Sequence, residues 1–191
     1  TLLLRANEPQ WFALAAALAI GSKLIRINQK HIFNPANIAI VALLLFDAPI
    51  WVSPGQWGND AVLVGFLGCC AVLVLSRAQR WDISIGFILI YGLLIGARAL
   101  WLGDPLAIAQ HQLFSGAVLV FAFFMLSDPK TTPKTRRNRI AYAGLVAALA
   151  FVLRFSFYST EAIFYALAIG SLILTMWNNC HWIVSYATLK R

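Results

Sequence analysis

The chain has 191 residues, of which 61% are hydrophobic and only 12% are charged, and its mean hydropathy is +0.77. Soluble domains usually carry about twice that share of charged residues, so the chain lacks the polar surface that a water-soluble protein needs. The composition predicts a polytopic membrane protein instead. The formal net charge is +8. Because the basic residues stand in short segments between apolar runs, they indicate membrane topology rather than a nucleic-acid partner.

Seven apolar segments follow one another, near residues 11–27, 37–52, 60–76, 82–101, 112–127, 138–157 and 160–177. Several lie near the lower limit of about 17 residues for a full span, so we expect some short or broken helices. The predicted fold class is an all-α polytopic membrane helical bundle with about seven membrane segments and an inverted repeat. Residues 1–191 are expected to form a single integral membrane domain. The opening "TLLLRANEPQ" looks like the end of a helix, so we expect further N-terminal sequence.

The loops between these segments alternate in charge. With alternate loops on opposite sides, every basic residue except Arg5, Arg98 and Arg154 falls on one side. The positive-inside rule makes that side cytoplasmic. We therefore expect a multi-pass protein of the bacterial cytoplasmic membrane, with the loop 127–139 on the cytoplasmic side.

Two loops on that side each contain an Asx-Pro pair. "HIFNPANI" contains Asn34 and Pro35, and "SDPKTTP" contains Asp128 and Pro129. An Asx side chain caps a helix, and proline fits its first turn, so each pair predicts a helix start. Two helix N-termini that converge would suit an anion such as a phosphate. Ordinary helix capping is the alternative, and the sequence leaves both open.

The second loop carries a resemblance to a known family. Residues 115–155 resemble the membrane subunit shared by two respiratory complexes, which is called RnfD in the Rnf ferredoxin:NAD oxidoreductase and NqrB in the sodium-pumping NADH:quinone oxidoreductase. That family carries a "GAFFMATDPVTSP" type motif, then a Gly-Arg pair and a Gly-rich helix that ends in Arg. The matching residues are Ala122, Phe123, Phe124, Met125, Asp128, Pro129, Thr132, Pro133, Arg139 and Arg154. Residues 22–45 are similar to the family's "K…FNPA" helix through Lys30, Phe33, Asn34, Pro35 and Ala36.

The resemblance implies a membrane subunit of an electron-transfer complex that can couple redox chemistry to ion movement. The lipid bilayer and other membrane subunits are the implied partners. The implied cofactor is a flavin, FMN or riboflavin, or a contacting quinone. We expect Asn34, Asp128, Thr131 and Thr132 to form the polar mouth of the site, with Arg139 available for a phosphate.

The chain also departs from the family pattern. Family members attach FMN covalently through a Thr in an S/T-G-A-T type loop, which a "GETS" segment follows. The nearest stretch here is Ser115-Gly116-Ala117-Val118, which lacks that Thr, and no "GETS" is present. Any flavin is therefore expected to be non-covalent. Trp51 or Trp57 are candidates for stacking on such a ring.

No sequence pattern points to a metal, haem or iron–sulfur centre. Cys69, Cys70 and Cys180 form no CxxC motif. The histidines lie near segment ends without the spacing of a haem site, and His111 is expected to start the helix that contains "FFM". Whether the protein is itself an enzyme is undecided.

Two charged residues near the outer side remain. Asp47 lies in "LLLFDAPIW" and Arg154 ends a later segment. They are candidates for an ion path or for a structural pair, and Arg98 is a further partner for Asp47. Two other functions stay open: a transporter or channel-like protein, and a structural anchor that has lost its cofactor.

Overall fold

The computed structural model describes residues 3–27, 30–53 and 61–189, and at residues 27, 30, 61–64 and 179–189 it describes the backbone only. In chain order the elements are β1 (Leu4–Ala6), α1 (Pro9–Ser22), β2 (Arg26–Ile27), β3 (Lys30–His31), α2 (Pro35–Leu45), β4 (Ile50–Val52), α3 (Ala61–Ala78), α4 (Trp81–Leu102), α5 (Leu106–Leu113), α6 (Gly116–Val120), the π-helical turn η1 (Phe121–Met125), α7 (Arg136–Ser156) and α8 (Ala162–Leu189).

Each predicted apolar segment overlaps a helix, so the expected helical architecture is confirmed. The main difference lies at 112–127, where α5 and the unit α6–η1 meet at a bend of 44°. The bend marks a second helix start, because the Ser115 hydroxyl accepts a hydrogen bond from the backbone N–H of Val118 at 3.5 Å. The prediction that His111 starts the "FFM" helix is therefore wrong, since His111 lies in α5.

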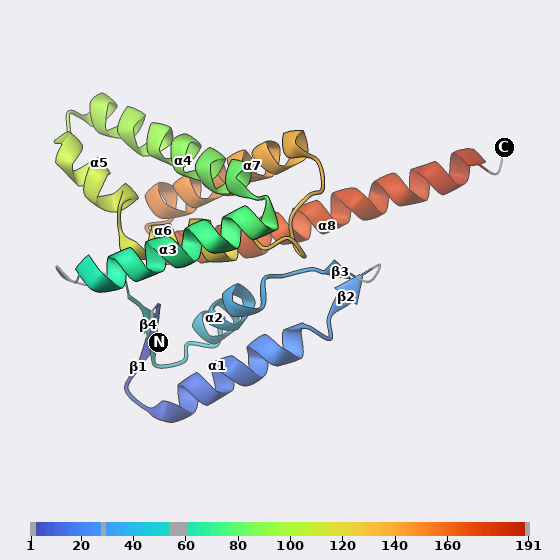
Figure 1. Cartoon of the computed structure of the whole chain (residues 1–191), viewed down its shortest axis with the longest axis horizontal. Helices are drawn as coiled ribbons and strands as arrows, with labels where there is room; N and C mark the ends of the chain where they lie inside the picture. Colours follow the sequence, from blue (N-terminus) through green and yellow to red (C-terminus); the bar gives the residue numbers. More distant parts are fainter. Residues whose placement is uncertain (1–2, 28–29, 54–60, 190–191) are drawn as a thin grey trace.

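Two short antiparallel strand pairs were not predicted. β1 pairs with β4, with Leu4 opposite Val52, and β2 pairs with β3, with Arg26 opposite His31. Strands of two or three residues carry too little alternation to be recognised in a sequence. Both pairs close the α1–α2 unit, one at each end of these two helices (Figure 1).

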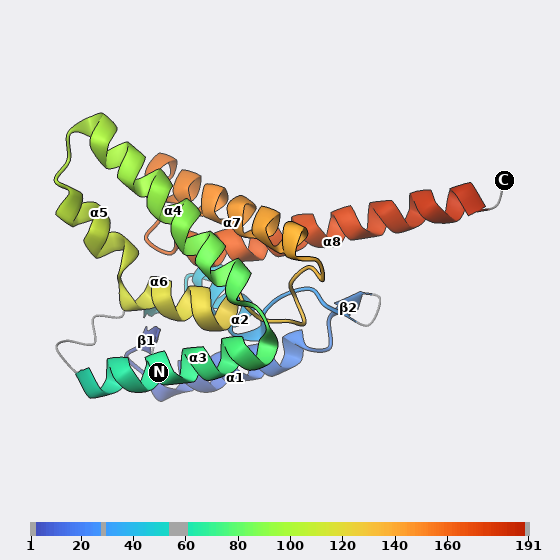
Figure 2. The ribbon, with the colours of Figure 1, turned by 45° about the horizontal axis from the view of Figure 1, so that its top comes forward.

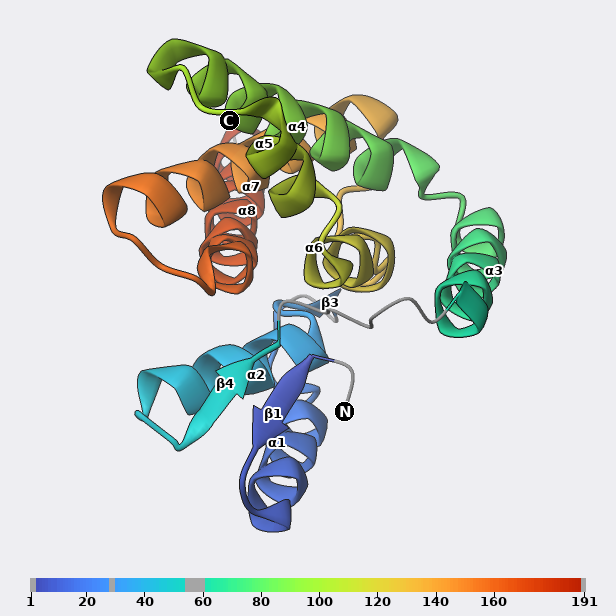
Figure 3. The same cartoon turned by 90° about the vertical axis from the view of Figure 1, so that its left-hand side faces the viewer.

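The helices surround the unit α6–η1. Viewed along the bundle, α1 and α2 lie on one side of it, α3 lies on a second side, and α4, α7 and α8 lie together on a third (Figure 3). Within that last group α4 lies beside α7, and α8 extends past the rest of the bundle (Figure 2). The α6–η1 unit therefore lies at the centre of the bundle (Figure 3).

Aromatic rings connect this centre to its neighbours. Phe121, in η1, is fully buried. Its ring centroid lies 5.3 Å from that of Phe87 in α4 and 5.9 Å from that of Phe164 in α8. Tilted and edge-on ring pairs at these distances are favourable contacts. The core of the bundle is therefore centred on η1.

Small residues allow the outer helices to approach one another closely. A Cβ added to Gly86 of α4 would lie 3.7 Å from the Cβ of Ala143 in α7, and one added to Gly170 of α8 would lie 3.0 Å from Val146 of α7. Small residues at helix contacts are a common feature of membrane bundles. The close approach of α8 to α7 therefore depends on Gly170, whereas a Cβ at Gly86 would make an ordinary van der Waals contact.

The lengths of the helices agree with the expected short and broken segments. Within the described residues, α4 and α7 are long and apolar enough to cross a membrane, and the bent pair α5 and α6–η1 is a third candidate. The apolar stretches Pro35–Leu45, Gly65–Ala78 and Ala162–Asn178 are shorter. The inverted repeat stays a prediction.

The two ends of the bundle differ in their loops. The β2–β3 pair, the α3–α4 turn and the loop between η1 and α7 lie at one end, and the β1–β4 pair and the α4–α5 connection lie at the other (Figure 1). The first end holds the basic loops of the sequence. We call it the basic end.

We expect Gly170→Leu to lower the melting temperature in detergent. The new side chain must push α8 from Val146, and overpacking of this kind typically costs about 1–3 kcal/mol of stability. Gly96→Leu is the matched control, because no atom lies within 4 Å of a Cβ at Gly96. Equal melting temperatures for the two variants would contradict the close α7–α8 contact.

Candidate functional site

The Asn34 side chain joins three segments at the basic end. Its Oδ1 accepts hydrogen bonds from the backbone N–H groups of Ala36 and Asn37, both at 3.1 Å, and so caps α2 as predicted. Its Nδ2 donates to the carbonyl oxygen of Met125 at 3.3 Å and to Oδ2 of Asp128 at 3.4 Å. The two predicted Asx-Pro loops are therefore in direct contact, although they lie far apart in the sequence.

Asp128 does not start a helix, so this part of the prediction is wrong. Its Oδ1 accepts from the backbone N–H of Lys130 at 2.9 Å, and its carbonyl oxygen accepts from the Thr132 hydroxyl at 2.9 Å. These bonds form a compact turn. Pro133 disfavours a helical conformation at Thr132, so no helix runs on from Pro129. The next helix, α7, begins after the cap residue Thr135. One helix N-terminus, rather than two, reaches the junction.

The π-helical turn η1 supplies the third part of this junction. A π-turn displaces carbonyl groups from their usual helical partners, and such turns are frequent at functional sites. Here the carbonyl of Ala122 accepts from the Ser84 hydroxyl at 2.7 Å, and that of Phe123 accepts from the Ser127 hydroxyl at 2.6 Å. Together with the bond from Asn34 to Met125, side chains from the N-cap of α2 and from α4 hold the turn. Sequence reasoning missed Ser84, because a lone serine in an apolar run has no distinctive local pattern.

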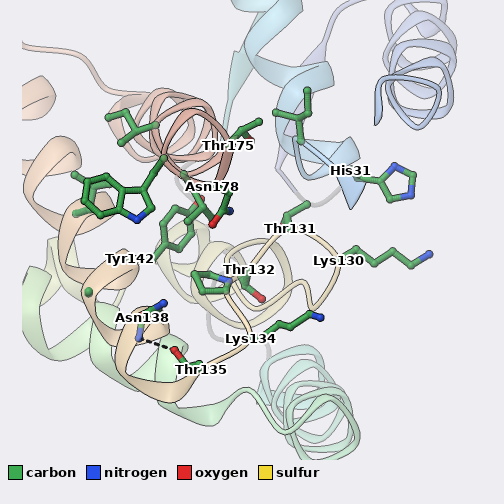
Figure 4. Close-up of a pocket in the computed structure, with 17 residues that line it drawn as sticks. His31, Lys130, Thr131, Thr132, Lys134, Thr135, Asn138, Tyr142, Thr175 and Asn178 are labelled. Atoms are coloured by element: carbon green, nitrogen blue, oxygen red, sulfur yellow. Dashed lines mark hydrogen bonds between the residues drawn. The ribbon is translucent and has the colours of Figure 1, made fainter. Parts of the chain in front are cut away.

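Thr131 and Thr132 line a cavity of about 720 Å³ at the basic end (Figure 4). The segment 130–135 forms one wall, and α7 and α8 form the wall across from it. The lining residues are His31, Ile32, Lys130, Thr131, Thr132, Pro133, Lys134, Thr135, Asn138, Ala141, Tyr142, Leu145, Ile173, Leu174, Thr175, Trp177 and Asn178. Asn34 and Asp128 do not line it, but they hold the turn from which its threonines extend.

The cavity combines a basic rim with an aromatic wall. Lys130 and Lys134 are exposed on the loop, and Tyr142 and Asn178 stand on the helices across from it (Figure 4). The Tyr142 hydroxyl lies 3.1 Å from the Ser171 hydroxyl, a hydrogen bond that fixes the ring. Cations at the rim suit an anionic group, and the aromatic and aliphatic wall suits a flat ring.

Arg139 lies outside this cavity, although we expected it to serve the same site. Its Nη2 lies 2.6 Å from Oδ2 of Asp82, its Nε donates to the same oxygen at 2.7 Å, and its Nη1 donates to the carbonyl of Lys134 at 2.7 Å. Arg80 donates to the adjacent carbonyl, that of Pro133, at 2.9 Å. Burial and then the charge of Arg139 lower the pKa of Arg80, and Asp82 opposes the shift. The two arginines therefore position the cavity loop.

The outer charged residues lie apart from the cavity. Asp47 is exposed beyond the end of α2 with a φ of 53°, and Arg98 pairs with Asp104 at 3.7 Å instead. Neither Asp47 nor Arg154 belongs to an ion pair among the described residues. Trp51 is exposed on β4 and does not line the cavity.

Trp57, the other candidate for stacking on a flavin ring, lies outside the described residues. The part of the chain that the structure describes holds no group of three His, Cys, Asp or Glu side chains placed to bind a metal ion.

Comparison with known proteins supports the resemblance that the two loops carry in the sequence. A profile of the NQR2, RnfD, RnfE family matches residues 12–181, which covers most of the chain and both loops. The chain belongs to this family. The apolar helices and the family together indicate a multi-pass integral membrane protein.

Curated relatives within the family match a smaller part. The chain is 41% identical over 101 residues to the RnfD-type subunit of the ion-translocating oxidoreductase complex of Klebsiella pneumoniae. It is 34% identical over 99 residues to the protein of the same name from Citrobacter koseri, and 38% over 101 residues to that from Salmonella paratyphi B. Each match covers 52% of this chain and 27% of the relative. The chain therefore matches only about a quarter of the length of these relatives.

We expect Asn34→Ala to destabilise the protein by about 1–3 kcal/mol. The variant loses a helix cap and leaves the buried Met125 carbonyl without this donor. Thr135→Ala is the matched control, because Thr135 caps α7 on an exposed loop and is expected to cost less. The measurement is thermal unfolding in detergent, and a larger effect for Thr135→Ala would contradict the role of Asn34.

The Asp82–Arg139 pair allows a second test. Only 10% of the Asp82 side chain and 14% of the Arg139 side chain are exposed, so either single variant leaves a buried charge without its partner. We expect Asp82→Asn and Arg139→Gln each to destabilise by about 3 kcal/mol or more, and the double variant by less than the sum of the two. Additive effects in this cycle would show that the pair contributes no coupling.

Proposed function

We propose that this chain is the part of an ion-translocating oxidoreductase subunit that holds a non-covalent FMN in the 720 Å³ cavity at its basic end. The observation that carries the proposal is the joined pair of family motifs. Asn34 binds the turn at Asp128, and the other side of that turn lines the cavity with Thr131 and Thr132. Pockets of a few hundred Å³ lined by apolar walls and a few polar groups are typical cofactor sites.

The polarity of the cavity favours FMN over a quinone. Lys130 and Lys134 can pair with a phosphate, an anionic group that a quinone lacks. Tyr142 and Trp177 provide flat surfaces for a ring. The hydroxyls of Thr131 and Thr132 donate to the Asp128 carbonyl, and their oxygens can accept from the polar edge of that ring. A bound flavin would supply the one- and two-electron chemistry, and the protein would bind and orient it. Lys130 and Lys134, rather than Arg139 as first expected, would then bind the phosphate.

We also propose the orientation and the surroundings of the chain. The basic end faces the cytoplasm, because basic loops are retained on that side of a bacterial membrane. The lipid bilayer surrounds the apolar helices, and other membrane subunits of the complex pack against them. The names of the relatives support membership of such a complex.

The visible absorption spectrum of the gently purified protein is the direct test. We expect flavin bands that move to the supernatant on denaturation. Bands that stay with the protein would mean covalent attachment, and a featureless spectrum from the intact complex would contradict the flavin. Solute flux in liposomes without a redox partner would then favour a transporter, and its absence would favour a cofactor-less anchor.

We expect the double variant Lys130→Gln and Lys134→Gln to weaken FMN binding at least tenfold and to leave riboflavin binding nearly unchanged. Riboflavin lacks the phosphate, and a charge-assisted hydrogen bond contributes about 1.5–3 kcal/mol. Lys23→Gln, at the same end of the bundle but outside the cavity, is the control. Binding is measured by quenching of flavin fluorescence. Equal losses for both flavins would contradict the phosphate assignment.

A further inference from the structure

A second cavity lies between the first turns of α4 and α7. Its volume is about 600 Å³, and it shares no lining residue with the first cavity. It is lined by Gln79, Trp81, Asp82, Ile85, Gly86, Leu89, Ile90, Arg136, Arg139 and Ile140. We call it the α4–α7 groove. The proposed flavin site does not include this groove.

The mouth of the groove is strongly basic. The adjacent segments 77–82 and 136–139 carry arginines at 77, 80, 136, 137 and 139, and Asp82 is their only carboxylate. Asp82 is already engaged by Arg139. Arg136 is exposed and belongs to no ion pair among the described residues. An anion at the mouth would therefore meet an available guanidinium, which can bind phosphate oxygens through two hydrogen bonds.

Arg139 is fixed at the same mouth. A guanidinium carries five N–H groups, and the bonds to Asp82 and to the Lys134 carbonyl use three of them. The remaining two stay available to a ligand beside Arg136. Because Arg139 is already held in place, it can bind a ligand at little cost in side-chain entropy.

Beyond the mouth the groove is apolar and accessible. Trp81, Ile85 and Leu89 follow one another at four-residue spacing along one face of α4, and they are 37%, 46% and 66% exposed. Ile140, on α7, is 40% exposed. From Trp81 to Leu89 this face extends about 12 Å along the helix axis. Both helices are long and apolar enough to cross a membrane. In a spanning orientation, the apolar part of the groove would lie at the depth of the acyl chains.

We propose that the α4–α7 groove binds one anionic phospholipid. Its phosphate pairs with Arg136 and with the remaining N–H groups of Arg139, and an acyl chain lies along Trp81, Ile85 and Leu89. Basic pockets between membrane helices on the cytoplasmic side are known to suit such headgroups, and tryptophan is favoured at the headgroup level. A zwitterionic choline lipid fits less well, because the one carboxylate at the mouth is taken by Arg139.

The test uses the purified full chain in mixed micelles with brominated phospholipids, which quench tryptophan fluorescence on contact. We expect dibrominated phosphatidylglycerol to quench in a saturable way at lower mole fraction than dibrominated phosphatidylcholine. Trp81→Phe should remove this lipid-selective component. Arg136→Gln should weaken the preference for phosphatidylglycerol about fivefold, the effect of one basic residue at a membrane surface. Lys23→Gln is the matched control and should keep the preference.

Three outcomes would overturn the proposal. Equal quenching of the unaltered protein by the two lipids would show that the groove does not select a headgroup, and this result needs no variant. An unchanged preference in Arg136→Gln would place the anion elsewhere. Displacement of the brominated lipid by millimolar inorganic phosphate would show a site for free anions rather than for a lipid.

Discussion

The amide of Asn34 is the contact on which the site depends. One side chain caps α2 with its oxygen and, with its nitrogen, binds both the end of the π-turn and the carboxylate of Asp128. An amide side chain carries an NH2 donor and a carbonyl acceptor on one group, so it can serve both kinds of partner at once. Replacing it by a carboxylate would remove the donor and set two negative charges side by side. The capping chemistry of one helix therefore fixes the turn that shapes the cavity.

The π-turn explains why this amide has a carbonyl to bind. In an uninterrupted α-helix, the carbonyls near Met125 would bond to backbone N–H groups of the same helix, or, in its last turn, would lack a partner. An unpaired carbonyl is costly inside a membrane. The wider turn redirects them, and hydroxyl groups of Ser84 and Ser127 pair with two of them. The buried aromatic contacts of Phe121 then hold the turn at the centre of the bundle. The π-turn η1 therefore both exposes carbonyls to side-chain donors and carries the Phe121 ring that packs at the centre of the bundle.

The sequence predicted the features that are encoded locally. Hydrophobic runs located the helices, and Asn34-Pro35 predicted a capped helix start because both residues act within one turn. Asp128-Pro129 failed as a helix start because Pro133 intervenes, so the same local pattern had two outcomes. Short strands left no periodic signal, and most of α5 lies between the apolar segments predicted at 82–101 and 112–127.

Long-range pairing was the part that the sequence did not predict. Arg139 was expected at a cofactor phosphate, yet its partner Asp82 stands on another helix, 57 residues earlier. No spacing rule connects two charges at that separation. The contact between Asn34 and Asp128 was expected only as a convergence of two helix ends, and its actual form needed the folded π-turn.

Arg139 also links the two cavities of the basic end. It lines the α4–α7 groove, and it donates to the carbonyl of Lys134, a residue that lines the other cavity. A guanidinium that moves toward an anion in the groove must carry or release the loop it holds. A ligand of one cavity that moves this loop changes the affinity of the other cavity for its own ligand. By thermodynamic reciprocity, the second ligand changes the affinity for the first by the same factor. If the proposed lipid occupies the groove, Arg139 would connect the membrane around the protein to the geometry of the cavity loop.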